Sequence, residues 1–100
     1  MKTEIEARDH IARDQIKEMR WRIDELDREL VKLLNRRAEL VKEIGDAKKS
    51  AGIKVSDNPR EQDVYRNIQS HNSGPLPEPL LREVYEQGII PVMRKIQEPA

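Results

Sequence analysis

Apolar residues follow one another at alternating steps of three and four positions through the first half of the chain. This series forms the seam: Ile16, Met19, Ile23, Leu26, Leu30, Leu33, Arg37, Leu40, Ile44, Ala47 and Ala51. A mean spacing of 3.5 residues is typical of a helix that packs along its length against other helices. The pattern predicts a helix from about residue 15 to about residue 50, with Gly52 as its stop.

Two shorter helices are predicted after this long one. Asn58, Pro59 and Glu61 form a helix start with Glu61 at the capping-box position, and the helix runs to about Ser70. Its inner face holds Val64, Tyr65 and Ile68. Residues 71–77, rich in Asn, Ser, Gly and Pro, predict a loop.

The third helix is predicted to start near Glu78 and to carry its apolar face through to residue 96. That face is Leu81, Val84, Tyr85, Ile89, Val92 and Ile96. Pro91 lies inside this pattern and should kink or break the helix, because proline lacks the backbone N–H and crowds the preceding turn.

No strand pattern accompanies these helices, so the predicted class is all-α, with one long and two shorter helices. A helix of about 36 residues is about 54 Å long, whereas a compact 100-residue chain has a radius of gyration of about 13 Å. The chain cannot cover such a helix alone, and we expect an intertwined homodimer. Residues 1–15 form an N-terminal extension, helical or disordered, ahead of a helical domain over residues 16–97.

Composition narrows the function classes. The 19 basic and 19 acidic residues cancel, so no overall basic field favours nucleic acid. The chain has no cysteine, which suits a cytoplasmic location, and it shows neither a signal peptide nor an apolar run of membrane-spanning length. Spacings of Cys or His that are typical of metal sites are also missing from the sequence, so we expect no metal.

Arg37 interrupts the apolar seam with a guanidinium. A charge on such a seam either escapes to solvent at its edge or requires an anionic partner. Lys48 lies 11 residues later, about 20° from the same azimuth and about 16 Å along the axis. Two cations on one stripe repel each other, so an anionic ligand between them is the favoured interpretation. Taken alone, Lys48 is most typical of a solvated residue near a helix C-terminus, where a cation is favoured.

Four other polar residues have two interpretations each. Arg20 pairs with Asp24 at i,i+4, or it reaches into the pocket of a partner subunit. Asp57 and Glu61 serve as helix caps, or together with Arg60 they face a ligand at the helix start.

The stretch from Met19 to Glu61 strongly resembles the all-helical chorismate mutases. The shared pattern is an arginine at the helix start, I-D-x-L-D-x-x-L, L-L-x-x-R, a lysine before the loop, and V-x-D-x-x-R-E. The resemblance continues more weakly to Gln97 and covers about residues 16–97. It implies an isomerase that converts chorismate to prephenate in phenylalanine and tyrosine biosynthesis, a homodimer with two equivalent sites, and no metal or organic cofactor.

The resemblance also assigns roles to residues. Arg37 would hold a carboxylate of the substrate, which is a dicarboxylate, and Arg20 would hold a carboxylate in the partner's site. Lys48 and Gln97 would donate to the ether oxygen, where negative charge develops as the C–O bond breaks. Because Gln97 is an amide, which does not titrate, activity should stay flat through neutral pH.

Further positions implied by the resemblance are Arg60, a basic site residue, and Asp57 and Glu61, near the ring hydroxyl of the substrate. Met93 stands where many members carry a serine that contacts a substrate carboxylate, and a thioether cannot donate that hydrogen bond. Two other functions remain open. One is an isochorismate–pyruvate lyase, which the V-x-D-x-x-R-E motif disfavours. The other is a mutase-like module of low activity that regulates a shikimate-pathway partner enzyme.

Overall fold

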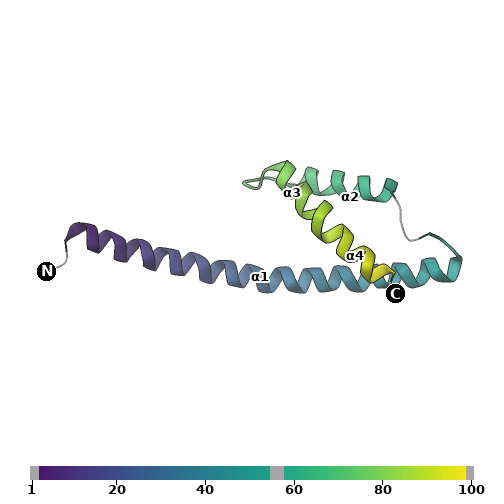
Figure 1. The fold of residues 1–100 in the computed structure, drawn as a ribbon, viewed down its shortest axis with the longest axis horizontal. Helices are drawn as coiled ribbons and strands as arrows, with labels where there is room; N and C mark the ends of the chain where they lie inside the picture. The colour runs from purple at the N-terminus through teal and green to yellow at the C-terminus, as the bar shows by residue number, and fades with distance from the viewer. Residues whose placement is uncertain (1–2, 55–57, 99–100) are drawn as a thin grey trace. The chain divides into compact units, whose positions relative to one another are not determined.

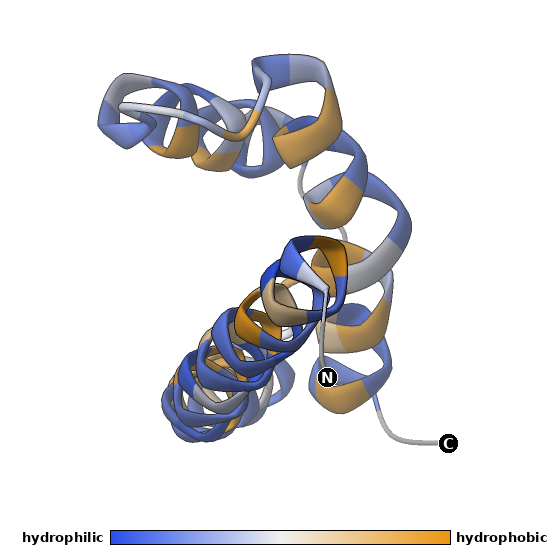
Figure 2. Ribbon diagram, turned by 90° about the vertical axis from the view of Figure 1, so that its left-hand side faces the viewer, coloured by the Kyte–Doolittle hydropathy of each residue, from blue (hydrophilic) through white to orange (hydrophobic). Residues whose placement is uncertain are grey.

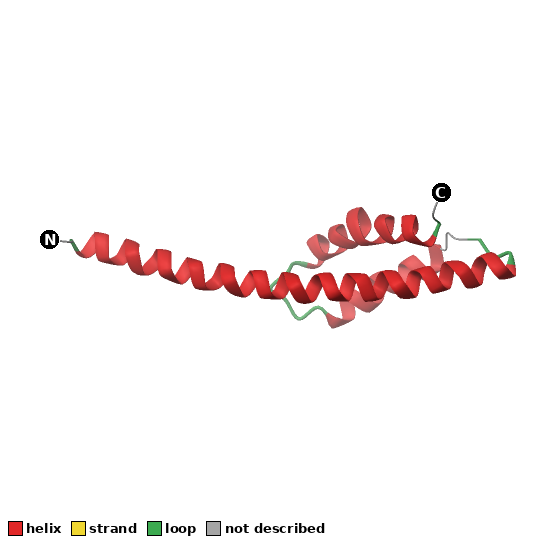
Figure 3. Ribbon diagram, turned by 90° about the horizontal axis from the view of Figure 1, so that it is seen from below, coloured by secondary structure: helices red, strands yellow, loops and turns green. Residues whose placement is uncertain are grey.

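The computed structural model describes residues 3–54 and 58–98, and its regular elements are all helices. Its elements are α1 (Glu4–Ala51), α2 (Asn58–His71), α3 (Glu78–Val84), the π-helical turn η1 (Tyr85–Ile89) and α4 (Ile90–Gln97) (Figure 1). No strand occurs among the described residues, which confirms the all-α prediction (Figure 3). The chain divides after Arg36 into two compact units.

Helix α1 begins at Glu4, about a dozen residues before the predicted start near residue 15. A capping box explains this early start: Glu6 N–H donates to Thr3 Oγ1 at 3.2 Å, and Thr3 N–H donates to Glu6 Oε2 at 3.1 Å. The following turns also continue the seam, because Ile5 and Ala12 precede Met19 by two heptads and one. The predicted N-terminal extension is therefore helical from its fourth residue.

In the first unit, the seam of α1 is exposed. Leu26, near its middle, keeps 62% of its surface accessible. The ion pair between Arg22 and Glu18, at 3.3 Å and one turn apart, is solvent-exposed and adds little stability. Because most helices depend on packing of an apolar face, residues 4–36 require a surface that their own unit does not supply.

The second unit contains α1 from Arg37 onward together with the remaining helices. Its most buried side chains are Tyr65 of α2 and Met93 of α4, each 6% exposed. On α1 the covered stripe contains Ala38, Val41, Gly45 and Lys48. The seam lies beside this stripe, and Leu40 on the seam remains 53% exposed. Every helix thus carries both hydrophobic and hydrophilic residues along its length (Figure 2).

The helix that was predicted from Glu78 onward is interrupted, as Pro91 indicates. The N–H of Ile90 donates to the carbonyl of Tyr85, a π-type bond, and Pro91 follows in the first turn of α4. This wider turn shifts the inner face by one residue. The predicted face is consequently wrong beyond Ile89: Val92 is 52% exposed, whereas Met93 is buried and Gln97 is half-buried. It is also wrong at Val84, before the π-helical turn, because this residue is 51% exposed.

Two side-chain interactions hold α2 to the segment that follows it. The guanidinium of Arg82 lies 4.0 Å from the centre of the Tyr65 ring, a distance typical of a cation–π contact. In the loop, Asn72 accepts from Gly74 N–H at 3.0 Å and donates to the Leu76 carbonyl at 2.9 Å. Gly74 has a positive φ of 81°, which favours glycine at this turn.

None of the helices in the described ranges combines the length and apolar character needed to span a bilayer.

Candidate active site

A pocket of about 450 Å³ lies within the second unit, between α1, α2 and α4. Its walls come from residues that are far apart in the sequence: Arg37, Leu40, Val41, Ile44, Lys48, Arg60, Glu61, Val64, Ile90, Met93, Arg94 and Gln97. Apolar walls with a few convergent polar groups are typical of small-molecule sites. Six residues that the sequence predicts for the site line this pocket: Arg37, Lys48, Arg60, Glu61, Met93 and Gln97.

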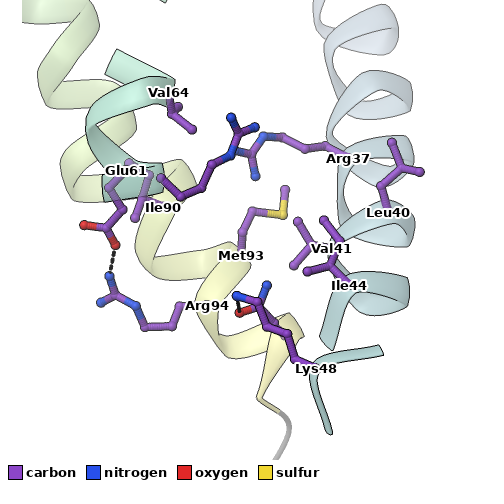
Figure 4. A pocket seen from close by; sticks show the side chains of 12 residues that line it. Arg37, Leu40, Val41, Ile44, Lys48, Glu61, Val64, Ile90, Met93 and Arg94 are labelled. Carbon is purple, nitrogen blue, oxygen red and sulfur yellow. Dashed lines mark hydrogen bonds and ion pairs between the residues drawn. The ribbon is translucent and has the colours of Figure 1, made fainter. Parts of the chain in front are cut away.

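Cations dominate the polar part of this lining. Arg37 and Lys48 come from α1, Arg60 from α2 and Arg94 from α4, and Glu61 is the one carboxylate among the lining residues. Arg37 and Lys48 both extend from α1 toward α4 (Figure 4). Such a set of positive groups around partly apolar walls favours an anionic ligand, because low-dielectric surroundings strengthen each charge interaction.

Lys48 and Gln97 meet at one end of the pocket. The Lys48 ammonium donates to Gln97 Oε1 at 3.4 Å, and both side chains are half-buried. Because the ammonium attracts the carbonyl end of the amide, the NH₂ end of Gln97 is left to donate elsewhere. Two donors from different helices therefore stand beside each other, which is the arrangement needed to stabilise an oxygen that becomes negative during a reaction.

Met93 lies between Arg37 and Lys48. Its side chain points from α4 toward α1, with Arg37 on one side and Lys48 on the other (Figure 4). It is among the most buried residues of the second unit, so its thioether acts as a packing element in the floor of the pocket. The hydrogen-bond donors of this pocket thus come from other residues.

Gly45 lies inside the helical pattern of α1, where a glycine costs about 1 kcal/mol relative to alanine, yet it is the one buried residue of this helix. A Cβ atom at this position would lie 2.6 Å from the carbonyl oxygen of Gln97 and 3.1 Å from its Cγ. The glycine therefore allows α4 to end directly against α1. A glycine within a strong helical pattern was the available signal, but it does not say which segment approaches.

Arg94 is a charged lining residue of the pocket that the sequence analysis did not predict. It forms an ion pair with Glu61, so the start of α2 is tied to α4 at the pocket (Figure 4). Glu61 was predicted at a capping-box position, and its carboxylate here meets a guanidinium from another helix. The ion pair between Arg94 and Glu61 depends on the one-residue shift of the inner helical face after η1. No local sequence pattern reveals this shift.

Two predicted site residues lie elsewhere. Arg20 is on α1 in the first unit and is not among the lining residues of the pocket. Asp57 lies outside the described residues. Within residues 3–54 and 58–98, no group of three or more His, Cys, Asp or Glu side chains could hold a metal ion.

The family model for chorismate mutase type II matches residues 19–98. The bifunctional chorismate mutase/prephenate dehydratase of Aquifex aeolicus is 34% identical over 80 residues, covering 76% of this chain and 22% of that protein. A chorismate mutase of Methanocaldococcus jannaschii is 34% identical over 56 residues, covering 56% of this chain and 57% of that protein. The chain thus spans only part of the length of these two relatives.

A solved structure gives an independent likeness of the fold. The chorismate mutase (form II) of Thermus thermophilus superposes with a TM-score of 0.81 at 28% sequence identity. The match covers 85% of this chain and 96% of that one. The helical arrangement is therefore shared over nearly the whole of the solved chain.

Proposed function

We propose, for a chain that belongs to the chorismate mutase type II family, that this protein rearranges chorismate to prephenate. The observation that carries the proposal is the pocket in which Lys48 and Gln97 meet beside Arg37 and Arg60. The sequence resemblance predicted this family, and the family match confirms it. The chemistry of the site supports the proposed activity and substrate.

Charge complementarity supports a dicarboxylate substrate. The pocket lining contains four cations, Arg37, Lys48, Arg60 and Arg94, and one carboxylate, Glu61, which pairs with Arg94. Arg37 provides a planar fork that matches a carboxylate in a bidentate contact. Anchoring the carboxylates fixes the enolpyruvyl side chain over the ring, which converts a rare conformer of the substrate into the bound one.

The reaction itself needs no group from the protein to be transferred. One C–O bond of the ether breaks while one C–C bond forms within the same molecule, and no proton moves. Lys48 and Gln97 would donate to the ether oxygen, where negative charge grows toward the transition state. Because this charge is largest in the transition state, their contribution falls mainly on kcat.

We further propose that the active species is an intertwined homodimer. The seam of α1 is left exposed in a single chain, and a second copy offers the same apolar surface. Arg20 would then hold a carboxylate in the partner's pocket, and Asp57 and Glu61 would lie near the ring hydroxyl. These roles, and a cytoplasmic location, stay predictions.

The deciding experiment incubates the purified protein with chorismate and separately with isochorismate, with Arg37→Ala run in parallel. Prephenate from chorismate, lost in Arg37→Ala, is the expected result. Pyruvate from isochorismate as the main reaction would assign the protein as a lyase instead. No turnover of either substrate would favour a mutase-like module that acts on a pathway partner. That module would be detected as a rise in turnover when the partner enzyme is added.

A further inference from the structure

Gly45 of α1 lies directly against the end of α4. An added Cβ would lie 2.6 Å from the backbone oxygen of Gln97, and an ordinary van der Waals contact begins at 3.4 Å. The contact involves backbone rather than the flexible end of a side chain, so it cannot be relieved by a rotamer change. The end of α4 would have to move by about 0.8 Å, the difference between these two distances.

Gly45 and Lys48 lie on the same face of α1, because they are three residues apart. The hydrogen bond from Lys48 to Gln97 Oε1, at 3.4 Å, is already at the long end of the range. A displacement of Gln97 by nearly an ångström would break this contact and redirect the NH₂ group. Misplacement of a reacting group by about 1 Å can lower the rate of an enzyme about 100-fold.

We propose that Gly45 is a positioning residue of the reaction, which sets the gap between α1 and α4 so that Gln97 is aimed beside Lys48. The inference rests on the proposed mutase function. Gly45 does not touch the substrate, and its effect on catalysis passes through Gln97. A glycine that only relieves crowding in the core would instead affect stability, and its effect on the rate would not depend on the side chain at position 97.

A double-mutant cycle separates the two roles. The wild type, Gly45→Ala, Gln97→Ala and the double variant are compared in kcat and KM for chorismate. We expect kcat to fall about 10-fold to 100-fold in Gly45→Ala, with KM changed less than about 3-fold. In the Gln97→Ala background, Gly45→Ala should lower kcat by less than about 2-fold further, because the amide that it misplaces is already gone.

Gly88→Ala is the matched control. A Cβ at Gly88 in η1 would have no atom within 4 Å, and its φ is not in the left-handed region. This variant has the same chemical change in a helical segment and should keep kcat within about 2-fold of the wild type. Helix content by circular dichroism and the midpoint of urea unfolding are measured for all variants.

The outcomes are distinct. The positioning role is overturned if Gly45→Ala lowers kcat equally in the wild-type and in the Gln97→Ala background. The mutase function stands in that case. A Gly45→Ala protein that loses native helix content also overturns it, because the glycine would then serve folding as a whole. An inactive wild type refutes the proposed function instead. As a readout independent of turnover, the ¹⁵N resonance of the Gln97 side-chain amide should shift in Gly45→Ala and stay in place in Gly88→Ala.

Discussion

Residues 4–36 of α1 and the stretch of α1 from Arg37 onward carry the same seam but differ in what covers the rest of their surface. In the later stretch, α2 and α4 cover the stripe beside the seam, which includes Val41, Gly45 and Lys48. In the earlier stretch nearly every described residue is exposed. One chain therefore builds a pocket but leaves its seam open, and an open apolar seam is typical of a surface that is completed by another copy.

The largest expected effect concerns the later stretch. Lys48→Ala should lower kcat about 100-fold to 1000-fold with a small change in KM, because the lost donor acts mainly on the transition state. Steady-state kinetics with chorismate measure it. Lys49→Ala is the control, since that neighbouring side chain is exposed and outside the pocket lining. A rise in KM with an unchanged kcat would assign Lys48 to ground-state binding instead.

The earlier stretch is tested by placing a charge on its seam. Leu26→Lys should raise the dissociation constant of the homodimer at least about 100-fold, because an unpaired charge would be buried between two copies. Analytical ultracentrifugation measures this change, and activity should fall with it. Trp21→Lys is the control, since this exposed residue lies about 160° around the helix from the seam. A dimer that tolerates Leu26→Lys would place the interface elsewhere.

The aim of Gln97 is tested through pH. The wild type should keep a flat rate between about pH 6 and 8, because an amide does not titrate there. In Gln97→Glu only the protonated acid can donate a hydrogen bond. Because a free glutamic acid has a pKa of about 4.3, kcat should fall about tenfold per pH unit above that value. A pH–rate profile for both proteins measures the difference. Parallel flat profiles would show that position 97 does not donate to the reacting oxygen.

A mixing experiment links the two stretches. Homodimers of Arg20→Ala and of Arg37→Ala should both be inactive. When equal amounts of the two variants are mixed and their subunits exchange, the heterodimers should recover about a quarter of the wild-type activity. If Arg20 acts in the partner's pocket, each heterodimer has one site with both arginines and one with neither. Co-refolding the two variants and assaying chorismate turnover tests this. Activity that stays at the level of the separate variants would mean that both arginines serve the same chain.

Local patterns predicted the helices and singled out Arg37, Lys48, Arg60 and Glu61, since heptad spacing and helix-start motifs are properties of neighbouring residues. Met93 and Gln97 were assigned by the family resemblance instead. The early start of α1 was missed because its first turns are rich in charge and its signal is the Thr3–Glu6 capping box. The inner face beyond η1 was wrong by one residue, because Pro91 indicated an interruption but not the π-helical turn that shifts the period. The roles of Gly45 and Arg94 depend on which helices contact each other. The spacing of residues along the sequence does not specify those contacts.

The smallest expected effect concerns Met93, which packs the floor of the pocket on the covered side of α1. Met93→Ser would restore a hydroxyl donor and should lower KM for chorismate about 3-fold, since a net hydrogen bond is worth about 1 kcal/mol. It should also lower the free energy of unfolding by about 2 kcal/mol, because it removes most of a buried side chain. Met93→Leu keeps the volume without the hydroxyl and should leave KM unchanged. Kinetics and urea unfolding of the two variants measure both effects. An equal KM for the serine and leucine variants would mean that no substrate carboxylate reaches this position.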